Sequence, residues 1–359
     1  MNLQKDQLYP IELSLYRVKK TWGGWPGKIG EIWSLSCYPH ESLALNGILS
    51  GQSLREIVGE FQQKLLGKGF ELDPREPFPL LLKFIASTKD LSIQVHPHDA
   101  YTLEEGLPKV GRDKIFYIIN VKPDAKIYYG FNDRTNKKKV IEKFNEGSLQ
   151  QLMNPVSVKP GEVYTVPAGR IHSIGKGVGL LEIQRHSDLA FSLSYHGKKD
   201  IKENDNSHQL LEALKILDLN ATSPKPIPKI SFTSDNNRME WLGLTPNFIL
   251  RKLYIKNSLE LSLNGNRFQV YTGLKGMGWL RWGFSGISIL IQPSQSVLVP
   301  AIQEDLFFES EDGLEVLETS VPDLSGETIE HMVSFGIKLD RIADLGGEDY
   351  GRILKECMS

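Results

Sequence analysis

The chain has 359 residues and a formal net charge of −2, a balance that predicts neither nucleic-acid binding nor attraction to an anionic membrane surface. It has no apolar run of about 18 residues, so no transmembrane helix is predicted. The two cysteines, Cys37 and Cys357, form neither a disulfide framework nor a CxxC metal motif, so we expect a reduced, cytoplasmic protein. The 32 glycines and 19 prolines favour many short strands and turns.

The first quarter of the chain predicts short strands, one helix and one strand with an unusual lysine. Residues 8–50 alternate between strand-like segments and turns. Residues 52–68 place apolar side chains at helical spacing, and Ser53 suits the N-cap of that helix. Residues 80–85 are a dense apolar strand that contains Lys83. A lysine there extends its amine out of the apolar layer, pairs with an acid or faces a cavity, and the sequence leaves these interpretations open.

A second strand, this one with a polar face, follows the lysine strand. Alternation puts Ser92, Gln94 and His96 on one face and apolar residues on the other. A polar face of this kind suits a strand that lines the interior of a polar barrel. Further along, residues 99–110 are predicted to be a loop and residues 137–153 a helix.

The most distinctive stretch runs from Pro160 to His172. Its alternation predicts a strand, which ends in a Pro-Ala-Gly turn and then presents His172. A histidine in such a place is more often packed than a ligand. However, His172 could meet Gln94 and His96 across a small barrel, and imidazole together with an amide oxygen suits zinc. The spacing alone leaves a metal site and a packed histidine both open.

The second half of the chain repeats the first. Residues 220–229 carry three prolines and predict an extended linker between the halves. Asp305 occupies the position of His172 in the repeat, so we predict a second unit with the same architecture but without the histidine. Two segments recur with similar spacing and core residues: Pro160–Ala168 as Pro293–Ala301, and Gly179–Ile183 as Gly313–Glu318.

Several of these segments resemble a known family. The run from Gly161 to His172 fits the second motif of cupins, and Leu91–Pro97 resembles the Gln-x-His-Pro strand of type I mannose-6-phosphate isomerases of the shorter, bacterial type. The resemblance implies a mainly β fold of two cupin-type (jelly-roll) β-barrels with a few helices. Together with the linker it gives three predicted domains: an N-terminal cupin with the metal site and helical insertions (1–220), a degenerate second cupin (231–320) and a C-terminal helical tail (321–359).

The resemblance also implies a function. The family consists of zinc enzymes that interconvert mannose 6-phosphate and fructose 6-phosphate through a cis-enediol(ate). Carried over by position, the metal ligands are Gln94, His96 and His172. The expected partner is a small-molecule sugar phosphate, with neither nucleic acid nor membrane involved. The reaction needs a base near C2, a stabiliser for the developing oxyanion and cations for the phosphate. Three residues are candidate substrate contacts: Lys83, Ser92 and Glu182.

The sequence departs from the family pattern at the fourth metal ligand. The family has a lysine and a ligand glutamate where this chain has Arg112 and Lys114. At about 4 Å and an effective dielectric constant near 20, a charged lysine opposes a divalent ion by roughly 8 kcal/mol. This opposition is relieved if Lys114 is neutral or turned away. Alternatively, Asp113 or Glu182 could supply the missing carboxylate.

A second departure removes two family arginines, whose positions hold Ser192 and Lys198. The candidate catalytic residues are therefore Arg112, Lys114 and Lys198. Three hypotheses follow. The chain is a family isomerase with a rearranged site, a non-catalytic cupin homologue that binds a sugar phosphate or a partner, or an isomerase or epimerase for another sugar phosphate with Lys114 as acid or base. We predict the first, a mannose-6-phosphate isomerase.

Overall fold

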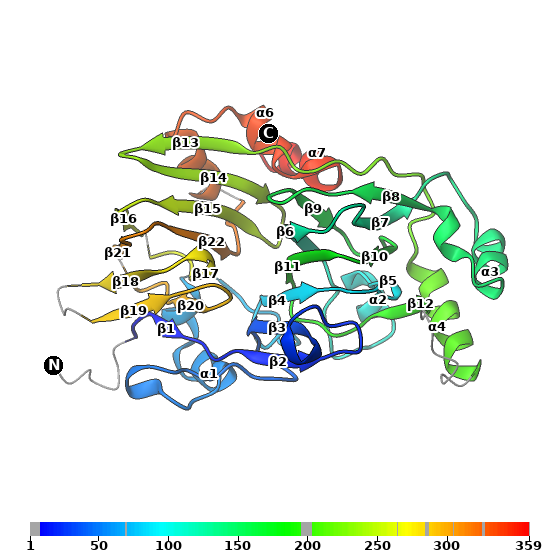
Figure 1. Ribbon diagram of the computed structural model, residues 1–359, viewed down its shortest axis with the longest axis horizontal. Helices are drawn as coiled ribbons and strands as arrows, with labels where there is room; N and C mark the ends of the chain where they lie inside the picture. The colour runs from blue at the N-terminus through cyan, green and yellow to red at the C-terminus, as the bar shows by residue number, and fades with distance from the viewer. Residues whose placement is uncertain are drawn as a thin grey trace. The chain divides into compact units, whose positions relative to one another are not determined.

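The chain divides into two compact units. The computed structural model describes residues 8–68, 70–194, 203–263, 265–283, 287–303, 305–324 and 327–358. Unit 1 consists of Met1–Tyr16, Trp33–Leu81 and Ile227–Ser359, and unit 2 consists of Arg17–Ile32 and Leu82–Pro226. Both units are built mainly from antiparallel strands (Figure 1).

Unit 2 contains most of two sheets that share one core. Phe116 and Ile118 from one sheet pack in the same cluster as Ile127 and Ile174 from the other. In hydrogen-bonded order, the six-stranded sheet is β2 (Tyr16–Lys19), β3 (Ile29–Leu35), β4 (Leu81–Ala86), β11 (Val178–Gln184), β6 (Lys114–Val121) and β9 (Val163–Val166). The five-stranded sheet is β12 (Phe191–Ser194), β5 (Ile93–Val95), β10 (His172–Ile174), β7 (Lys126–Phe131) and β8 (Met153–Ser157).

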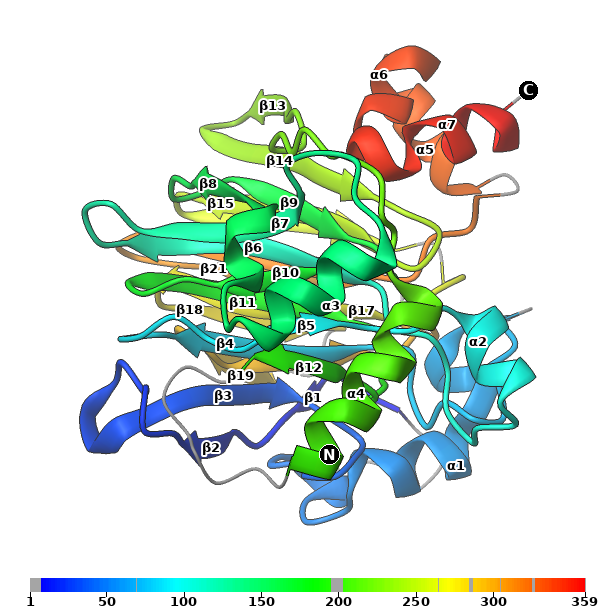
Figure 2. The same cartoon turned by 90° about the vertical axis from the view of Figure 1, so that its right-hand side faces the viewer.

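Helices cover one face of the five-stranded sheet of unit 2, as Figure 2 shows for α3 and α4. Their apolar residues, such as Val140 and Leu214, pack in one cluster with Ile93 and Val95 of β5. This cluster leaves the other face of β5, with Ser92 and Gln94, to the interior between the sheets. The helical elements of unit 2 are η1 (Pro26–Lys28), α2 (Asp99–Glu104), α3 (Lys137–Asn145), η3 (Leu149–Leu152) and α4 (Glu203–Ile216).

Unit 1 repeats the two-sheet arrangement. Tyr271 of one sheet packs edge-on against Phe308 of the other, with ring centroids 5.1 Å apart. The seven-stranded sheet is β1 (Ile11–Glu12), β20 (Ser296–Val299), β17 (Gln269–Gly276), β22 (Leu314–Ser320), β15 (Ile249–Ile255), β14 (Asn237–Leu244) and β13 (Ile230–Ser234). The four-stranded sheet is β16 (Ser258–Ser262), β21 (Asp305–Glu309), β18 (Gly278–Trp282) and β19 (Ser288–Ile291). The helical elements are α1 (Leu54–Leu66), η2 (Gly47–Leu49), α5 (Glu327–Ser334), α6 (Leu339–Asp344) and α7 (Gly347–Cys357).

The predicted helix after Ser53 is confirmed, and its start has a physical cause. The Ser53 hydroxyl accepts from the backbone N–H of Glu56, and the Glu56 carboxylate accepts from the backbone N–H of Ser53. This reciprocal capping box satisfies two backbone donors at the helix start. The apolar residues at helical spacing, including Ile57 and Phe61, are buried as predicted.

Two local predictions were wrong. Residues 99–110 are not a simple loop, because α2 occupies Asp99–Glu104 and is capped by His98, whose Nδ1 accepts from the backbone N–H of Tyr101. Residues 137–153 are not one helix, because α3 ends at Asn145 and Gly147 has a φ of 66°, which breaks the helical path before η3.

The predicted mainly β fold with a few helices is confirmed. In the described part of the chain, the hydrogen-bonded strand orders are open sheets, two per unit, rather than continuous closed barrels. The crossing from unit 2 to unit 1 at Pro226 falls inside the predicted linker. Residues 1–220 nevertheless do not form one contiguous unit, because β1 joins unit 1 by pairing Ile11 with Leu298 of β20.

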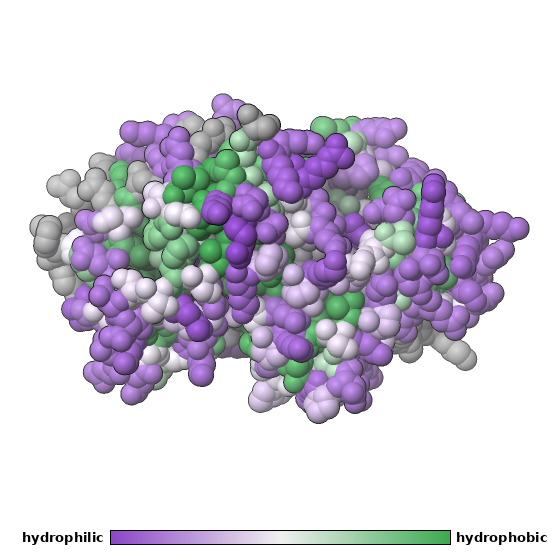
Figure 3. Space-filling view, turned by 90° about the horizontal axis from the view of Figure 1, so that it is seen from above, coloured by the Kyte–Doolittle hydropathy of each residue, from purple (hydrophilic) through white to green (hydrophobic). Residues whose placement is uncertain are grey.

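Figure 3 shows one face on which hydrophilic residues predominate and apolar residues form separate patches. No helix within the described residues has both the length and the apolar character needed to cross a bilayer.

Candidate active site

A cavity of about 360 Å³ lies within unit 2, lined by residues of both sheets. His96 is buried beside it, with its ring centroid 5.0 Å from that of His172. Lys198 lies outside the described residues. The remaining predicted site residues all line the cavity: Lys83, Ser92, Gln94, Arg112, Lys114, His172 and Glu182.

Glu182 stands at the centre of a cationic cluster in this cavity. Its Oε2 lies 2.8 Å from Lys114 Nζ on the neighbouring strand β6. Its Oε1 lies 3.6 Å from Lys83 Nζ on β4 and 3.8 Å from a guanidinium nitrogen of Arg112. One buried carboxylate therefore faces three buried cations, which gives the cluster a net charge of +2 when all four groups are ionised.

This arrangement shifts the pKa values of its members. Burial raises the pKa of Glu182, but Lys114, Lys83 and Arg112 outweigh that effect and hold this pKa well below its usual range. Burial and the neighbouring Arg112 lower the pKa of Lys114 to about 7. Burial also lowers the pKa values of Lys83 and Arg112. At neutral pH, Glu182 is thus ionised, and Lys114 exchanges between its charged and neutral forms.

The two histidines are held in one tautomer. His172 Nδ1 lies 2.9 Å from the carbonyl oxygen of Arg170, and His96 Nδ1 lies 3.1 Å from that of Leu189. Since a carbonyl can only accept, each Nδ1 carries the proton and each Nε2 keeps its lone pair. Both Nε2 atoms are buried and make no hydrogen bond within the described residues.

Burial and nearby cations keep both rings neutral. Burial, with the Lys114 ammonium adding to it, lowers the pKa of His172 to about 3. Burial, Lys114 and Arg112 place the pKa of His96 well below its ordinary value. A neutral imidazole with a free Nε2 and an Nδ1–H bonded to a carbonyl is the form in which histidine binds metal ions.

The residues therefore fit a divalent ion through three neutral donors. Strand pairing sets Gln94 directly opposite His172, so its amide lies beside the two imidazoles. Catalytic zinc sites commonly use three protein ligands and leave one position open. A group of three or more His, Cys, Asp or Glu side chains able to hold a metal ion is absent from the described residues. An anionic ligand is the missing part of the set.

Neither of the two acids considered as a replacement ligand is available for that role. Asp113 Oδ1 accepts from the backbone N–H of Ala168, 2.8 Å away, and so holds the Pro-Ala-Gly turn. Glu182 is engaged by the three cations around it. Lys114, at the position where the resemblance predicts a glutamate ligand, pairs with Glu182.

Sequence reasoning missed several residues of the site. Gln184 Oε1 accepts from a guanidinium nitrogen of Arg112 at 2.6 Å and fixes that side chain. Gln184 lies two residues after Glu182 on β11, so strand alternation could have placed it on the same face. Lys20, Glu31 and Asp188 also line the cavity, but they come from distant segments, and no pattern in the sequence links them.

The comparisons with known proteins agree with this architecture. No protein-family model matches the chain. It is 33% identical over 193 residues to the mannose-6-phosphate isomerase ManA of Bacillus subtilis, a match that covers 54% of this chain and 59% of that protein. It is 31% identical over 221 residues to the mannose-6-phosphate isomerase of Streptococcus mutans, covering 58% of this chain and 67% of that protein.

The solved structure of the mannose-6-phosphate isomerase from Bacillus subtilis has the same fold. The TM-score is 0.75 at 25% identity, with 87% of this chain and 99% of the other covered. A zinc-bound mannose-6-phosphate isomerase structure matches at 13% identity with a TM-score of 0.67 and covers 88% of this chain and all of the other, so it supports the fold alone. The paired sheets around a polar cavity are those of a cupin-type isomerase. The chain belongs to the mannose-6-phosphate isomerase family.

Proposed function

We propose that the chain interconverts mannose 6-phosphate and fructose 6-phosphate in the cavity of unit 2. The proposal rests on one observation, which is that two kinds of side-chain group lie together in this part of unit 2. The cationic cluster of Lys83, Arg112 and Lys114 lies beside two neutral histidines with unpartnered Nε2 atoms. The first group suits an anionic sugar, and the second suits the metal ion that the family implies.

The charge of the cluster favours a phosphorylated substrate. Three buried cations exceed the single carboxylate Glu182, so an added anion reduces the electrostatic cost of the cluster. Arg112 presents a guanidinium fixed by Gln184, and Lys83 presents a single ammonium. We assign Lys83 and Ser92 to substrate binding and Arg112 to stabilisation of the developing enediolate oxyanion.

Lys114 is the group best suited to move the proton between C1 and C2. Its pKa of about 7 lets the neutral amine accept a proton and the ammonium return it. Glu182 is a weak base, because three cations hold its pKa low, so we assign it to positioning Lys114 and Lys83. The comparisons do not favour the non-catalytic alternative, since the named relatives are isomerases.

The donors that would hold a zinc ion are Gln94, His96 and His172. When bound, the ion polarises the carbonyl and hydroxyl oxygens at C1 and C2. Its affinity is coupled to Lys114, because the neutral amine opposes a dication far less than the ammonium does. The same cationic surroundings that favour a phosphate thus limit the pH range of metal binding.

Metal analysis combined with turnover tests the proposal. Purified protein is expected to contain near-stoichiometric zinc and to isomerise mannose 6-phosphate, and His172→Ala should lose both. His208→Ala is the matched control, because His208 is exposed on α4 and should leave both unchanged. Metal-free protein without turnover would overturn the assignment. Turnover of a different sugar phosphate that survives chelation would favour the third hypothesis.

A further inference from the structure

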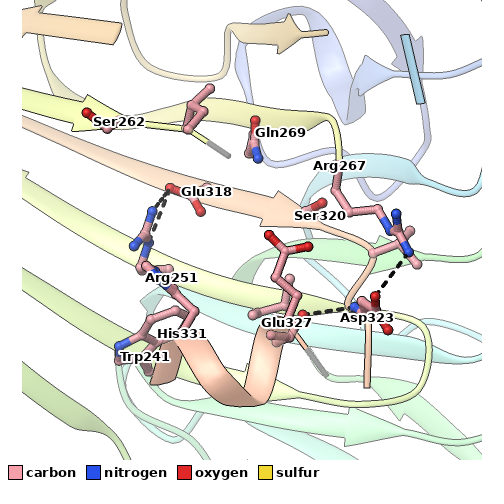
Figure 4. Close-up of a pocket in the computed structure, with 14 residues that line it drawn as sticks. Trp241, Arg251, Ser262, Arg267, Gln269, Glu318, Ser320, Asp323, Glu327 and His331 are labelled. Carbon is pink, nitrogen blue, oxygen red and sulfur yellow. Dashed lines mark hydrogen bonds and ion pairs between the residues drawn. The ribbon is translucent and has the colours of Figure 1, made fainter. Parts of the chain in front are cut away.

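Unit 1 contains a second polar cavity, of about 100 Å³, that the proposed isomerase does not use. It is lined by strands of the seven-stranded and four-stranded sheets and by α5, which contributes Glu327 and His331 (Figure 4). His331 packs edge-on against Trp241, with ring centroids 5.9 Å apart, so α5 lies against this cavity.

Strand register shows that the two cavities occupy equivalent places. In unit 2, Phe116 pairs with Glu182 on one side and with Tyr164 on the other. In unit 1, Tyr271 pairs in the same way with Glu318 and with Val297. The strand orders β4-β11-β6-β9 and β15-β22-β17-β20 correspond, so the two glutamates are equivalent residues on equivalent strands.

The equivalence extends to the other polar residues of the lining. Ser262 pairs with Asp305 as Gln94 pairs with His172. Five residues of the second cavity stand at the positions of five lining residues of the first: Arg251 for Lys83, Glu318 for Glu182, Arg267 for Arg112, Gln269 for Lys114 and Ser262 for Gln94. The second cavity is therefore the repeat of the first, with different chemistry.

Its described lining, unlike that of the first cavity, has no excess of cations, because Arg251 and Arg267 are set against Glu318, Asp323 and Glu327. A guanidinium nitrogen of Arg251 lies 2.6 Å from Glu318 Oε2, and one of Arg267 lies 3.7 Å from Asp323 Oδ2 (Figure 4). Gln269 is neutral where the first cavity has Lys114. No surplus of positive charge is thus present to favour a phosphate or another anion.

Polar atoms without partners remain in this lining. Gln269 Oε1, Trp241 Nε1 and Arg267 Nε are buried and make no hydrogen bond within the described residues. An unsatisfied buried polar atom costs about 1–3 kcal/mol, so a ligand that brings both donors and acceptors would be stabilised here. Hydroxyl groups do so, because each donates one hydrogen bond and accepts two.

We propose that the cavity of unit 1 is a second small-molecule site, which binds a neutral polyhydroxylated molecule. Its volume of about 100 Å³ has room for several water molecules, which suits a polyol of about three or four carbons. The carboxylate of Glu318 and the amide of Gln269 accept hydroxyl protons, and the guanidinium of Arg267 donates. The site belongs to unit 1 alone and does not depend on turnover in unit 2.

Saturation-transfer NMR on the full chain, with erythritol as the probe, tests the proposal. The wild type is expected to give a transfer signal, and Gln269→Leu should reduce it by about fivefold or more through loss of a buried acceptor. Ser262→Trp adds bulk to the lining from an exposed position and should abolish the signal even if Gln269→Leu fails to fold. Lys114→Gln, in the other cavity, should leave the signal intact.

Four outcomes would overturn the proposal. The first is the absence of transfer in the wild type. The second is a signal that persists in both Gln269→Leu and Ser262→Trp. The third is a signal lost in Lys114→Gln, which would place the polyol in unit 2. Displacement of erythritol from unit 1 by inorganic phosphate would contradict the neutral class of ligand.

Discussion

Units 1 and 2 share a scaffold and differ in the chemistry that it holds. In each unit a glutamate on the central strand lies between a cation on one neighbouring strand and an aromatic residue on the other: Glu182 with Lys83 and Phe116, and Glu318 with Arg251 and Tyr271. Around this shared element, unit 2 adds the cation Lys114 and two histidines. Unit 1 has Gln269 at the position of Lys114 and Asp305 at the position of His172.

The difference shows how few positions separate a cavity with an excess of cations from one without such an excess. Replacing one lysine by glutamine removes the charge nearest to the carboxylate, since Lys114 lies 2.8 Å from Glu182. Replacing the strand-end histidine by aspartate removes one of the two free imidazole nitrogens. The strand register stays the same, because the backbone hydrogen bonds that set it do not involve these side chains.

The largest expected effect comes from replacing Lys114 of unit 2 by glutamine, the residue found at the corresponding position of unit 1. Lys114→Gln should lower kcat for mannose 6-phosphate by about 10²- to 10⁴-fold, the usual contribution of a general base. Glu182 keeps Lys83 and Arg112 as partners, so the variant should fold. Steady-state turnover measures the effect, and Gln269→Lys in unit 1 is the control that should leave turnover unchanged. Full activity of Lys114→Gln would remove Lys114 from the reaction.

The second prediction compares the two glutamates. Glu182→Gln leaves three buried cations without a carboxylate and should destabilise unit 2 by about 3–5 kcal/mol. Glu318→Gln should cost less, because Arg251 is the one cation paired with it among the described residues and the Glu318 side chain is 13% exposed against 4% for Glu182. Denaturant unfolding followed by circular dichroism measures both changes. Equal losses of unfolding free energy in the two variants would show that the number of neighbouring cations does not determine the cost of removing the carboxylate.

Much of the fold and part of the candidate site could be predicted from the sequence, where the signals are local. Strand alternation placed Ser92 and Gln94 on the face that lines the cavity. Ser53, predicted as the N-cap, marked the start of α1. The helix α2 was missed because its cap is His98, which is not among the usual capping residues.

What could not be predicted depends on pairing between distant segments. The contact of Lys114 with Glu182 follows from the register of β6 and β11, and the join of β1 to unit 1 follows from its pairing with β20. The sequence repeat set Gly179–Ile183 against Gly313–Glu318, whereas the register makes Glu182 equivalent to Glu318 and Gly179 equivalent to Glu315. The register shift falls at equivalent places in the two units, with one unpaired residue at Ile119 of β6 and at Leu274 of β17, so Gly313 is not the equivalent of Gly179 and the matching glycines misplaced the strand.

The third prediction concerns the pH dependence of kcat/KM, which should differ between the wild type with Lys114 and the Lys114→Gln variant. Only the neutral amine of Lys114 accepts a proton, and its pKa is about 7, so kcat/KM should rise about tenfold per pH unit below 7 and level off above it. Rates measured across this range with zinc held in excess test the expectation. The residual kcat/KM of Lys114→Gln should not show this rise with pH. A profile that falls as pH rises through 7 would assign Lys114 as an acid instead.

The smallest expected effect concerns the residue that holds Arg112. Gln184 accepts from Arg112 at 2.6 Å, and the register places Ser320 at the corresponding position of unit 1. Gln184→Ser shortens the side chain and should remove this hydrogen bond, whose net value is about 0.5–1.5 kcal/mol. We expect kcat/KM to fall roughly two- to tenfold. The loss should appear mainly in KM if Arg112 binds the phosphate, and mainly in kcat if it stabilises the enediolate. Ser320→Gln, the reciprocal change, should alter neither constant, and an equal loss in that variant would show that the effect is one of folding.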